Sequence, residues 1–246
     1  MMKTENGSIG SIGQKLTAIL IVSILISTLV IGVFSYYSYR NNAIKLTGER
    51  ALSIAFSVAA NVDGDKLLEY ERTGKTDAYF EQVKAAMSEV KRANGASYVY
   101  SMVDDGDNYK LIISGYLEGE DQTAWGYLGY TDPKDIYTEE PALVFEDGVG
   151  RYTKPQDYGP PFGISITGFA PIHNAKGDVV GLVGIDIPMN EQNKAINKLI
   201  PIMAGMIVVT SVILIMIALV IIRKTITRPL RSIAEKSNLL VLGDTE

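Results

Sequence analysis

Two long apolar segments without a charged residue constrain this chain more than any other feature. The first covers 22 residues, 16–37, and the second covers 24 residues, 199–222. An α-helix rises about 1.5 Å per residue, so each segment is long enough to cross a hydrocarbon core of about 30 Å. A cleaved signal peptide is the alternative for the first segment, but its apolar core exceeds the usual length of about 7–15 residues. We therefore predict transmembrane helices at 16–37 and 199–222.

Basic residues beside these segments predict the orientation of the chain. Lys3 and Lys15 precede the first segment, and four cations follow the second: Arg223, Lys224, Arg228 and Arg231. Because positively charged flanks stay in the cytoplasm, we predict a cytoplasmic N-terminus at 1–15 and a cytoplasmic segment at 223–246. Residues 38–198 are then extracellular or periplasmic, in a multi-pass protein of the cell membrane.

The two sides of the membrane differ in charge. Residues 41–198 contain 15 Lys and Arg against 24 Asp and Glu, a net charge of −9, and the rest of the chain carries 8 basic and 4 acidic residues, a net charge of +4. Neither part offers the broad basic face that binds nucleic acid, so we exclude that class of partner. The inner cations favour contact with anionic membrane lipid.

The residue types that carry much of metal and nucleophile chemistry are scarce. The chain has no cysteine and one histidine, which excludes disulfides, thiolate zinc sites and centres with several imidazoles. Asp104, Asp105 and Asp107 lie in a short turn that lacks the rest of a calcium-binding loop. We find no catalytic constellation, and we expect no enzyme activity, metal or cofactor in this chain.

Periodicity predicts an α+β fold between the two membrane segments. We expect a long N-terminal helix that continues from the first segment to about Val62, and a second helix at 77–92 with an apolar stripe. Alternating apolar residues and turn signals predict four strands in two antiparallel hairpins, at 97–103, 109–114, 164–172 and 179–187. The connection at 115–163 is too long for an ordinary loop, so we expect short helices or an extra strand there, over one face of the sheet.

The last hairpin carries a family resemblance. The segments Gly168–Ile172 and Lys176–Ile187, with Tyr158 and Gly159 upstream, resemble the end of single-Cache sensor domains. The resemblance covers about 46–189 and implies a PAS-like extracellular domain, in which a long helix is followed by an antiparallel sheet.

A second resemblance follows the second membrane segment. Ile226–Leu230 together with Ile233, Ser237, Leu240 and Gly243 is similar to the first helix of a HAMP signalling module, here at 223–246. The 3-4-3 spacing of Leu230, Ile233, Ser237 and Leu240 is that of a coiled-coil seam. The resemblance places a second HAMP helix and an output domain after Glu246.

This order of parts is similar to that of bacterial and archaeal transmembrane receptors. It favours a methyl-accepting chemotaxis receptor that relays binding of a small extracellular molecule through HAMP. The alternatives are a histidine kinase, a diguanylate cyclase, or a membrane binding module without output. We expect a parallel homodimer, and contact with cytoplasmic signalling proteins only through domains after Glu246.

The candidate ligand site combines aromatic side chains with one carboxylate. Strand alternation places Tyr98 and Tyr100 on one face of the sheet, and Asp186 on the same face of the last strand. The long connection contributes further aromatic residues, which have an apolar body and a polar end suited to small polar ligands: Trp125, Tyr127, Tyr130 and Tyr158. The alternatives are that the aromatic residues form a core, and that Asp186 caps backbone N–H groups at the strand end.

The class of ligand stays open from the sequence. The resemblance favours a small organic acid, for which Lys110, Lys134, Arg151 and Lys154 are the candidate donors. The aromatic residues and the acidic charge favour a cation or amine. In amino-acid-binding relatives a terminal-strand aspartate similar in position to Asp186 holds the ligand amine, but their wider arginine, tryptophan and tyrosine pattern is not evident here.

The topology is testable because the natural chain has no cysteine. We expect a Lys176→Cys variant to react with a membrane-impermeant maleimide in intact cells, since the 174–177 turn is predicted to be outside. A cysteine in place of Lys3 serves as the control and should react only after lysis. Labelling of the Lys176→Cys variant only after lysis would contradict the orientation.

Overall fold

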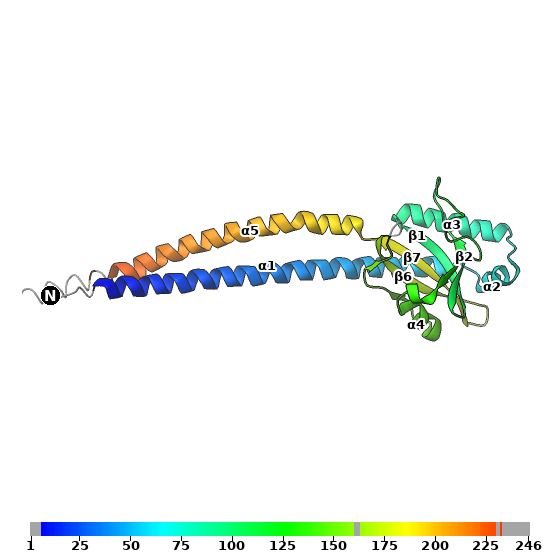
Figure 1. Cartoon of the computed structure of the whole chain (residues 1–246), viewed down its shortest axis with the longest axis horizontal. Helices are drawn as coiled ribbons and strands as arrows, with labels where there is room; N and C mark the ends of the chain where they lie inside the picture. Colours follow the sequence, from blue (N-terminus) through cyan, green and yellow to red (C-terminus); the bar gives the residue numbers. More distant parts are fainter. Residues whose placement is uncertain (1–5, 160–162, 230–231, 233–246) are drawn as a thin grey trace, which may run out of the picture. The chain divides into compact units, whose positions relative to one another are not determined.

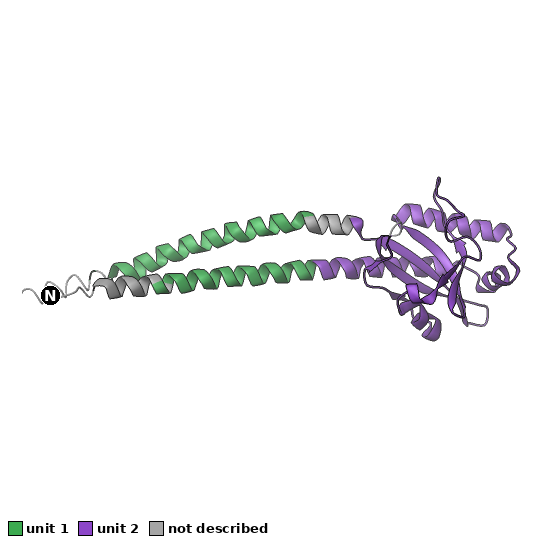
Figure 2. Ribbon diagram, in the orientation of Figure 1, with its two compact units in different colours: residues 1–39, 196–246 green, residues 40–195 purple. Residues whose placement is uncertain are grey.

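The computed structural model describes residues 6–159, 163–229 and 232. The chain divides into two compact units, which Figure 2 shows in different colours. Residues 1–39 and 196–246 form one, here called the helical unit, and residues 40–195 form the other, the sheet unit.

Long helices make up the helical unit. Helix α1 (Asn6–Ala59) begins there and continues into the sheet unit, and helix α5 (Asn190–Ile222) leads into a π-helical turn, η2 (Arg223–Thr227). Two stretches of helix are long and apolar enough to cross a membrane, Thr17–Ala59 and Lys198–Thr227. Within this unit the hydroxyls of Thr28 and Ser211 lie 3.2 Å apart. Of the predicted HAMP seam, Leu230, Ile233, Ser237 and Leu240 lie outside the described residues.

The sheet unit has the predicted α+β architecture, with a long N-terminal helix and an antiparallel sheet (Figure 1). Seven strands pair in the order β3-β2-β1-β7-β6-β4, with β5 also paired to β6. The four predicted strands are present as β1 (Tyr98–Asp105), β2 (Asn108–Ser114), β6 (Ile164–His173) and β7 (Val179–Pro188). The predicted second helix is α3 (Ala78–Asn94).

The long connection has structure of its own, as expected. It contains β3 (Thr131–Pro133), a 3-10 turn η1 (Lys134–Ile136), α4 (Glu140–Asp147), β4 (Arg151–Tyr152) and β5 (Gln156–Asp157). Its strands β3 and β4 lie toward opposite ends of the sheet, so the connection crosses one face of it.

One helix was not predicted. The first helix, expected to continue to about Val62, ends at Ala59, and α2 (Gly64–Thr73) begins a few residues later. The Asp63 side chain is the N-cap of α2, because it accepts hydrogen bonds from the backbone N–H groups of Asp65 and Lys66. The residues that follow the end of α1 therefore also contain the N-cap of α2. The sequence pattern indicates the end of the first helix but not the beginning of the next.

The two faces of the sheet bury different clusters. On one face Val99, Val183 and Ile185 pack with small residues of α1 and apolar residues of α2 and α3. On the opposite face Tyr100, Met102 and Leu182 pack with Val144 of α4 and with aromatic residues of the connection. The predicted alternation along β1 and β7 is therefore confirmed.

A glycine allows α1 to lie directly on the sheet. A Cβ atom at Gly168 of β6 would overlap backbone atoms of Ala51 and Leu52. Backbone atoms cannot move aside as a flexible side chain can, so a side chain at this position must push helix and strand apart. Gly168 is thus required for close packing of α1 on the sheet.

We expect Gly168→Ala to destabilise the sheet unit by about 1–3 kcal/mol through this overlap. The measurement is thermal unfolding of the full chain in detergent, followed by fluorescence of Trp125, the chain's single tryptophan. Gly205→Ala is the control, because a Cβ atom there meets nothing within 4 Å. Equal unfolding temperatures for wild type and Gly168→Ala would contradict the packing argument.

Candidate ligand-binding site

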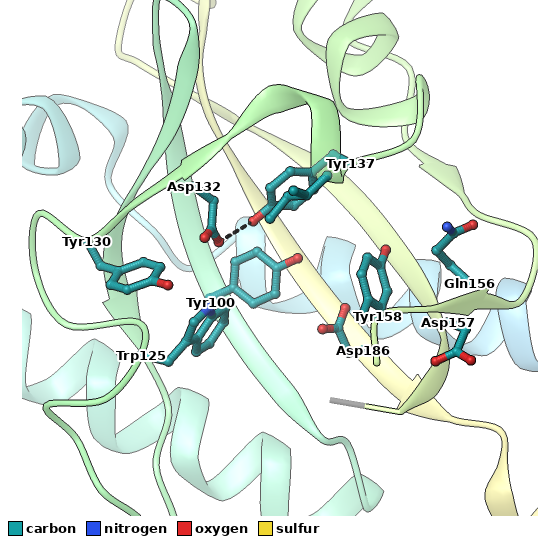
Figure 3. Close-up of a pocket in the computed structure, with 10 residues that line it drawn as sticks. Tyr100, Trp125, Tyr130, Asp132, Tyr137, Gln156, Asp157, Tyr158 and Asp186 are labelled. Atoms are coloured by element: carbon teal, nitrogen blue, oxygen red, sulfur yellow. Dashed lines mark hydrogen bonds between the residues drawn. The ribbon is translucent and has the colours of Figure 1, made fainter. Parts of the chain in front are cut away.

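A cavity of about 440 Å³ lies on the sheet face that the long connection crosses (Figure 3). Five of its lining residues are aromatic and three are carboxylates. The full lining consists of Tyr100, Trp125, Tyr130, Asp132, Ile136, Tyr137, Gln156, Asp157, Tyr158 and Asp186. This size is within the range of sites for small molecules, about 300–1,000 Å³.

Most of the predicted site residues meet in this cavity. Tyr100 comes from β1, Asp186 from β7, and the other three from the connection: Trp125, Tyr130 and Tyr158. Gly184 makes room for one of them, because a Cβ atom there would overlap the ring of Tyr100, its register partner across β1 and β7.

Two predicted residues lie outside the lining. Tyr98 packs on Trp125, with ring centroids 4.7 Å apart, and lines a neighbouring cavity of about 450 Å³ that also contains Lys91 and Glu120. Tyr127 is 47% exposed, and its ring packs edge-on against that of Tyr130 at 5.3 Å. Tyr98 therefore contacts the lining residue Trp125, and Tyr127 contacts the lining residue Tyr130.

Five lining residues were not predicted: Ile136, Tyr137, Asp132, Gln156 and Asp157. All come from the long connection, whose path over the sheet leaves no periodic signal. One local signal was present. Tyr130 and Asp132 are two positions apart, the spacing that puts two side chains on the same side of an extended segment. The strand itself, β3, has only three residues and was not predicted.

Asp132 is buried among hydrogen-bond donors that carry no charge. Its side chain is 7% exposed, and the Tyr137 hydroxyl donates to its Oδ2 atom at 3.0 Å. The side chains of Trp125 and Tyr130 also hydrogen-bond to this carboxylate. Burial raises the pKa of Asp132 above its ordinary value, and the three hydrogen bonds oppose that rise only in part.

Asp186 is the other buried carboxylate. It is 9% exposed, and the Thr167 hydroxyl donates to its Oδ1 atom at 2.7 Å. Among the described residues, Thr167 is the side-chain hydrogen-bond partner of Asp186, and the bond uses Oδ1. The Oδ2 atom is therefore available to a ligand. Burial raises the pKa of Asp186 to about 7, against the opposing effects of the Thr167 hydrogen bond and the Lys91 charge.

The tyrosines of the cavity keep their protons. Burial raises the pKa of Tyr100 and Tyr137 well above the ordinary value, and it raises the pKa of Tyr158 to about 12. Their hydroxyls therefore remain neutral donors and acceptors at physiological pH, and their rings present apolar surface.

The charge of Lys91 acts on Asp186 from the neighbouring cavity, but Lys91 is ion-paired with Glu120 at 2.6 Å and does not line this one. None of the described lining residues of this cavity is Lys or Arg. Of the four candidate donors for an anionic ligand, Lys110 pairs with Glu71 at 2.6 Å, Lys134 with Asp104 at 2.7 Å, and Arg151 with Asp147 at 2.6 Å. The fourth, Lys154, is exposed and lies outside the lining.

This arrangement favours binding of a cation over other chemistry. A buried carboxylate whose charge is balanced only in part is unfavourable, and a cationic ligand supplies further positive charge. The ring faces add cation–π attraction. Within the described part of the chain, no group of three or more acidic or imidazole side chains is placed to hold a metal ion.

Comparisons with known proteins give similarities to sensory domains. No protein-family model matches the chain, and no curated protein matches it. Similar solved structures include the sensory domain of the Campylobacter jejuni chemoreceptor Tlp3, with 14% identity and a TM-score of 0.46 over 71% of this chain and 66% of that one. The Tlp3 ligand-binding domain in complex with 4-methylisoleucine has 12% identity and a TM-score of 0.42, covering 70% and 61%.

A third similar structure is the sensor domain of the V. cholerae histidine kinase DctB. It has 11% identity and a TM-score of 0.46, covering 68% of this chain and 57% of that one. The chain thus spans less than two thirds of the length of each of these three structures. The three structures are a sensory domain, a ligand-binding domain and a sensor domain, respectively.

The raised pKa of Asp186 predicts a pH-dependent stability. Between about pH 4 and pH 7 the folded chain holds a proton that the unfolded chain has lost, so the free energy of unfolding falls as pH rises through this window. The slope from this one group is at most about 1.4 kcal/mol per pH unit. In an Asp186→Asn variant this fall in the free energy of unfolding is absent. We therefore expect the unfolding temperature of the variant, relative to that of wild type, to increase from pH 4 to pH 8.

The measurement is thermal unfolding of the full chain followed by Trp125 fluorescence. Asp135→Asn is the matched control, because Asp135 is exposed and lies outside the cavity lining. A difference between Asp186→Asn and wild type that stays constant from pH 4 to pH 8 would contradict the assignment.

Proposed function

We propose that the chain is the sensory part of a transmembrane receptor and that its sheet unit binds a small organic cation outside the cell. One observation carries the choice of ligand. Asp186 is a nine-tenths buried carboxylate that faces an aromatic cavity, and the described lining of that cavity contains no Lys or Arg.

Charge decides among the ligand classes that the sequence left open. An organic acid would bring a further negative charge next to Asp132 and Asp186, without a cation to receive it. An amino acid would place its ammonium group well at Asp186, but its carboxylate would lack a cationic partner in the described lining. An amine without a carboxylate satisfies Asp186 and adds no unpaired charge.

The covalent path from the site supports a role in signalling. Asp186 lies two residues before the end of β7, and α5 begins at Asn190. A ligand held by Asp186 therefore acts on the strand that continues into the second predicted membrane helix. A ligand can shift a two-state equilibrium only by its difference in affinity for the two states, and about 1–3 kcal/mol is typical of such coupling.

The rest of the receptor is proposed by resemblance. We assign the output to the class of methyl-accepting chemotaxis receptors, acting as a parallel homodimer through a HAMP module that begins near Arg223. A histidine kinase, a diguanylate cyclase and a binding module without output are the alternatives. The genomic sequence that follows Glu246 distinguishes these four.

The ligand proposal is tested with three four-carbon molecules that are cationic, neutral and anionic: n-butylamine, n-butanol and butyrate. We expect the full chain in lipid nanodiscs to bind n-butylamine most tightly, measured by calorimetry and by Trp125 fluorescence. Asp186→Asn should weaken n-butylamine binding by about 10- to 100-fold, the effect of losing a hydrogen bond to a charged group.

The control for this experiment is again Asp135→Asn, which should bind n-butylamine like wild type. Tighter binding of butyrate than of n-butylamine would overturn the proposal. Unchanged n-butylamine affinity in Asp186→Asn would place the ligand elsewhere.

A further inference from the structure

The cavity contains two buried carboxylates, and a ligand with one positive charge would neutralise only one of them. Asp132 is as buried as Asp186, and its described partners are the neutral side chains of Tyr137, Trp125 and Tyr130. Neutral donors satisfy the hydrogen-bonding capacity of a carboxylate but leave its charge uncompensated. The third carboxylate of the lining, Asp157, is exposed and is screened by water.

The two buried carboxylates come from different strands of the sheet. Asp132 belongs to β3 and Asp186 to β7, and strands β2 and β1 lie between them in the sheet. In Figure 3 the ring of Tyr100, on β1, lies between the two side chains. Both carboxylates act electrostatically on the phenol of Tyr100 and on that of Tyr137, so both are near the same two hydroxyls.

Much of the cavity lining is aromatic or aliphatic, and the ring of Tyr100 lies between the two carboxylates. The rings of Tyr100 and Trp125 pack edge to face with centroids 5.4 Å apart, and Ile136 adds an aliphatic side chain to the lining. Methylene groups that cover such a surface are removed from water, which is worth about 0.8 kcal/mol for each buried CH₂. An aliphatic chain therefore fits the region between the carboxylates.

Each of the two buried carboxylates retains an acceptor for a ligand ammonium group. At Asp186 the Oδ2 atom is left by the Thr167 hydrogen bond to Oδ1. A carboxylate offers about four acceptor positions, and the side chains of Tyr137, Trp125 and Tyr130 occupy three of those on Asp132. One position remains there, and the oxygen atoms of the neighbouring tyrosines accept further N–H groups.

We propose that the ligand is a linear aliphatic diamine or polyamine, with one terminal ammonium group at Asp186, a second at Asp132, and the methylene chain over the ring of Tyr100. This inference rests on the proposed function, since it requires that the cavity bind organic cations. It adds that two separated positive charges are recognised, and it gives Asp132 a role that the sequence did not show.

The first experiment compares ligands on the wild-type full chain in lipid nanodiscs. The probes are α,ω-diamines from 1,4-diaminobutane to 1,8-diaminooctane, each matched with the amino alcohol of the same length, in which a neutral hydroxyl replaces one ammonium group. We expect the best diamine to bind at least tenfold more tightly than its amino alcohol, measured by calorimetry and by Trp125 fluorescence.

The second experiment assigns the second charge to Asp132. In Asp132→Asn we expect diamine affinity to fall at least tenfold, and to fall more than the affinity for the amino alcohol of the same length, so that the diamine loses its advantage. Asp135→Asn, three residues further along the chain and outside the lining, removes the same charge and should leave both affinities unchanged. Thermal unfolding followed by Trp125 fluorescence shows whether the Asp132→Asn variant is folded.

The outcomes separate this inference from the proposed function. Equal affinities for diamine and amino alcohol at every length would overturn the two-charge inference, while n-butylamine binding would keep the organic-cation site. If Asp132→Asn and Asp135→Asn lose diamine affinity equally, Asp132 acts only through its long-range charge. That result would also overturn the two-charge inference. Absence of binding for all the amines would overturn both.

Discussion

The contact between α1 and strand β6 at Gly168 decides how the two faces of the sheet are used. Because this glycine lets helix backbone lie on strand backbone, α1 closes one face together with α2 and α3. That face buries a large apolar cluster. The long connection covers the opposite face with large aromatic side chains, which do not pack as closely as the alanines of α1, and the cavity lies there.

The electrostatic character of the cavity follows from where its charges are paired. Lys110, Lys134 and Arg151 form ion pairs with acidic neighbours and do not line the cavity, whereas Asp132 and Asp186 are buried in it with neutral hydrogen-bond donors. Two of the acidic residues of the predicted outer segment are thus buried in one cavity, where low solvent exposure makes each charge more costly. A cationic ligand would relieve that cost, and the energy released would be available to shift a conformational equilibrium.

Strand β7 combines the two tasks expected of a sensory unit. It places Asp186 in the cavity through its face alternation, and its last residues lead directly into α5. On its opposite face Val183 and Ile185 belong to the core that packs on α1. The proposed ligand contact, core packing and the covalent link to the second predicted membrane helix therefore meet within ten residues of one strand.

The sequence by itself determined the features that depend on local periodicity. Two uncharged segments gave the candidate membrane helices, and alternation along β1 and β7 placed Tyr100 and Asp186 on one face, because successive side chains of a strand point to opposite sides. The start of α2 was hidden, since its N-cap Asp63 lies among the polar residues that indicate the end of the first helix. Only the tertiary structure decided that Asp132 and Tyr137 join Asp186, and that Lys110, Lys134 and Arg151 are paired elsewhere. These outcomes depend on the path of a 49-residue connection over the sheet and on contacts between distant residues, and neither leaves a repeating pattern in the chain.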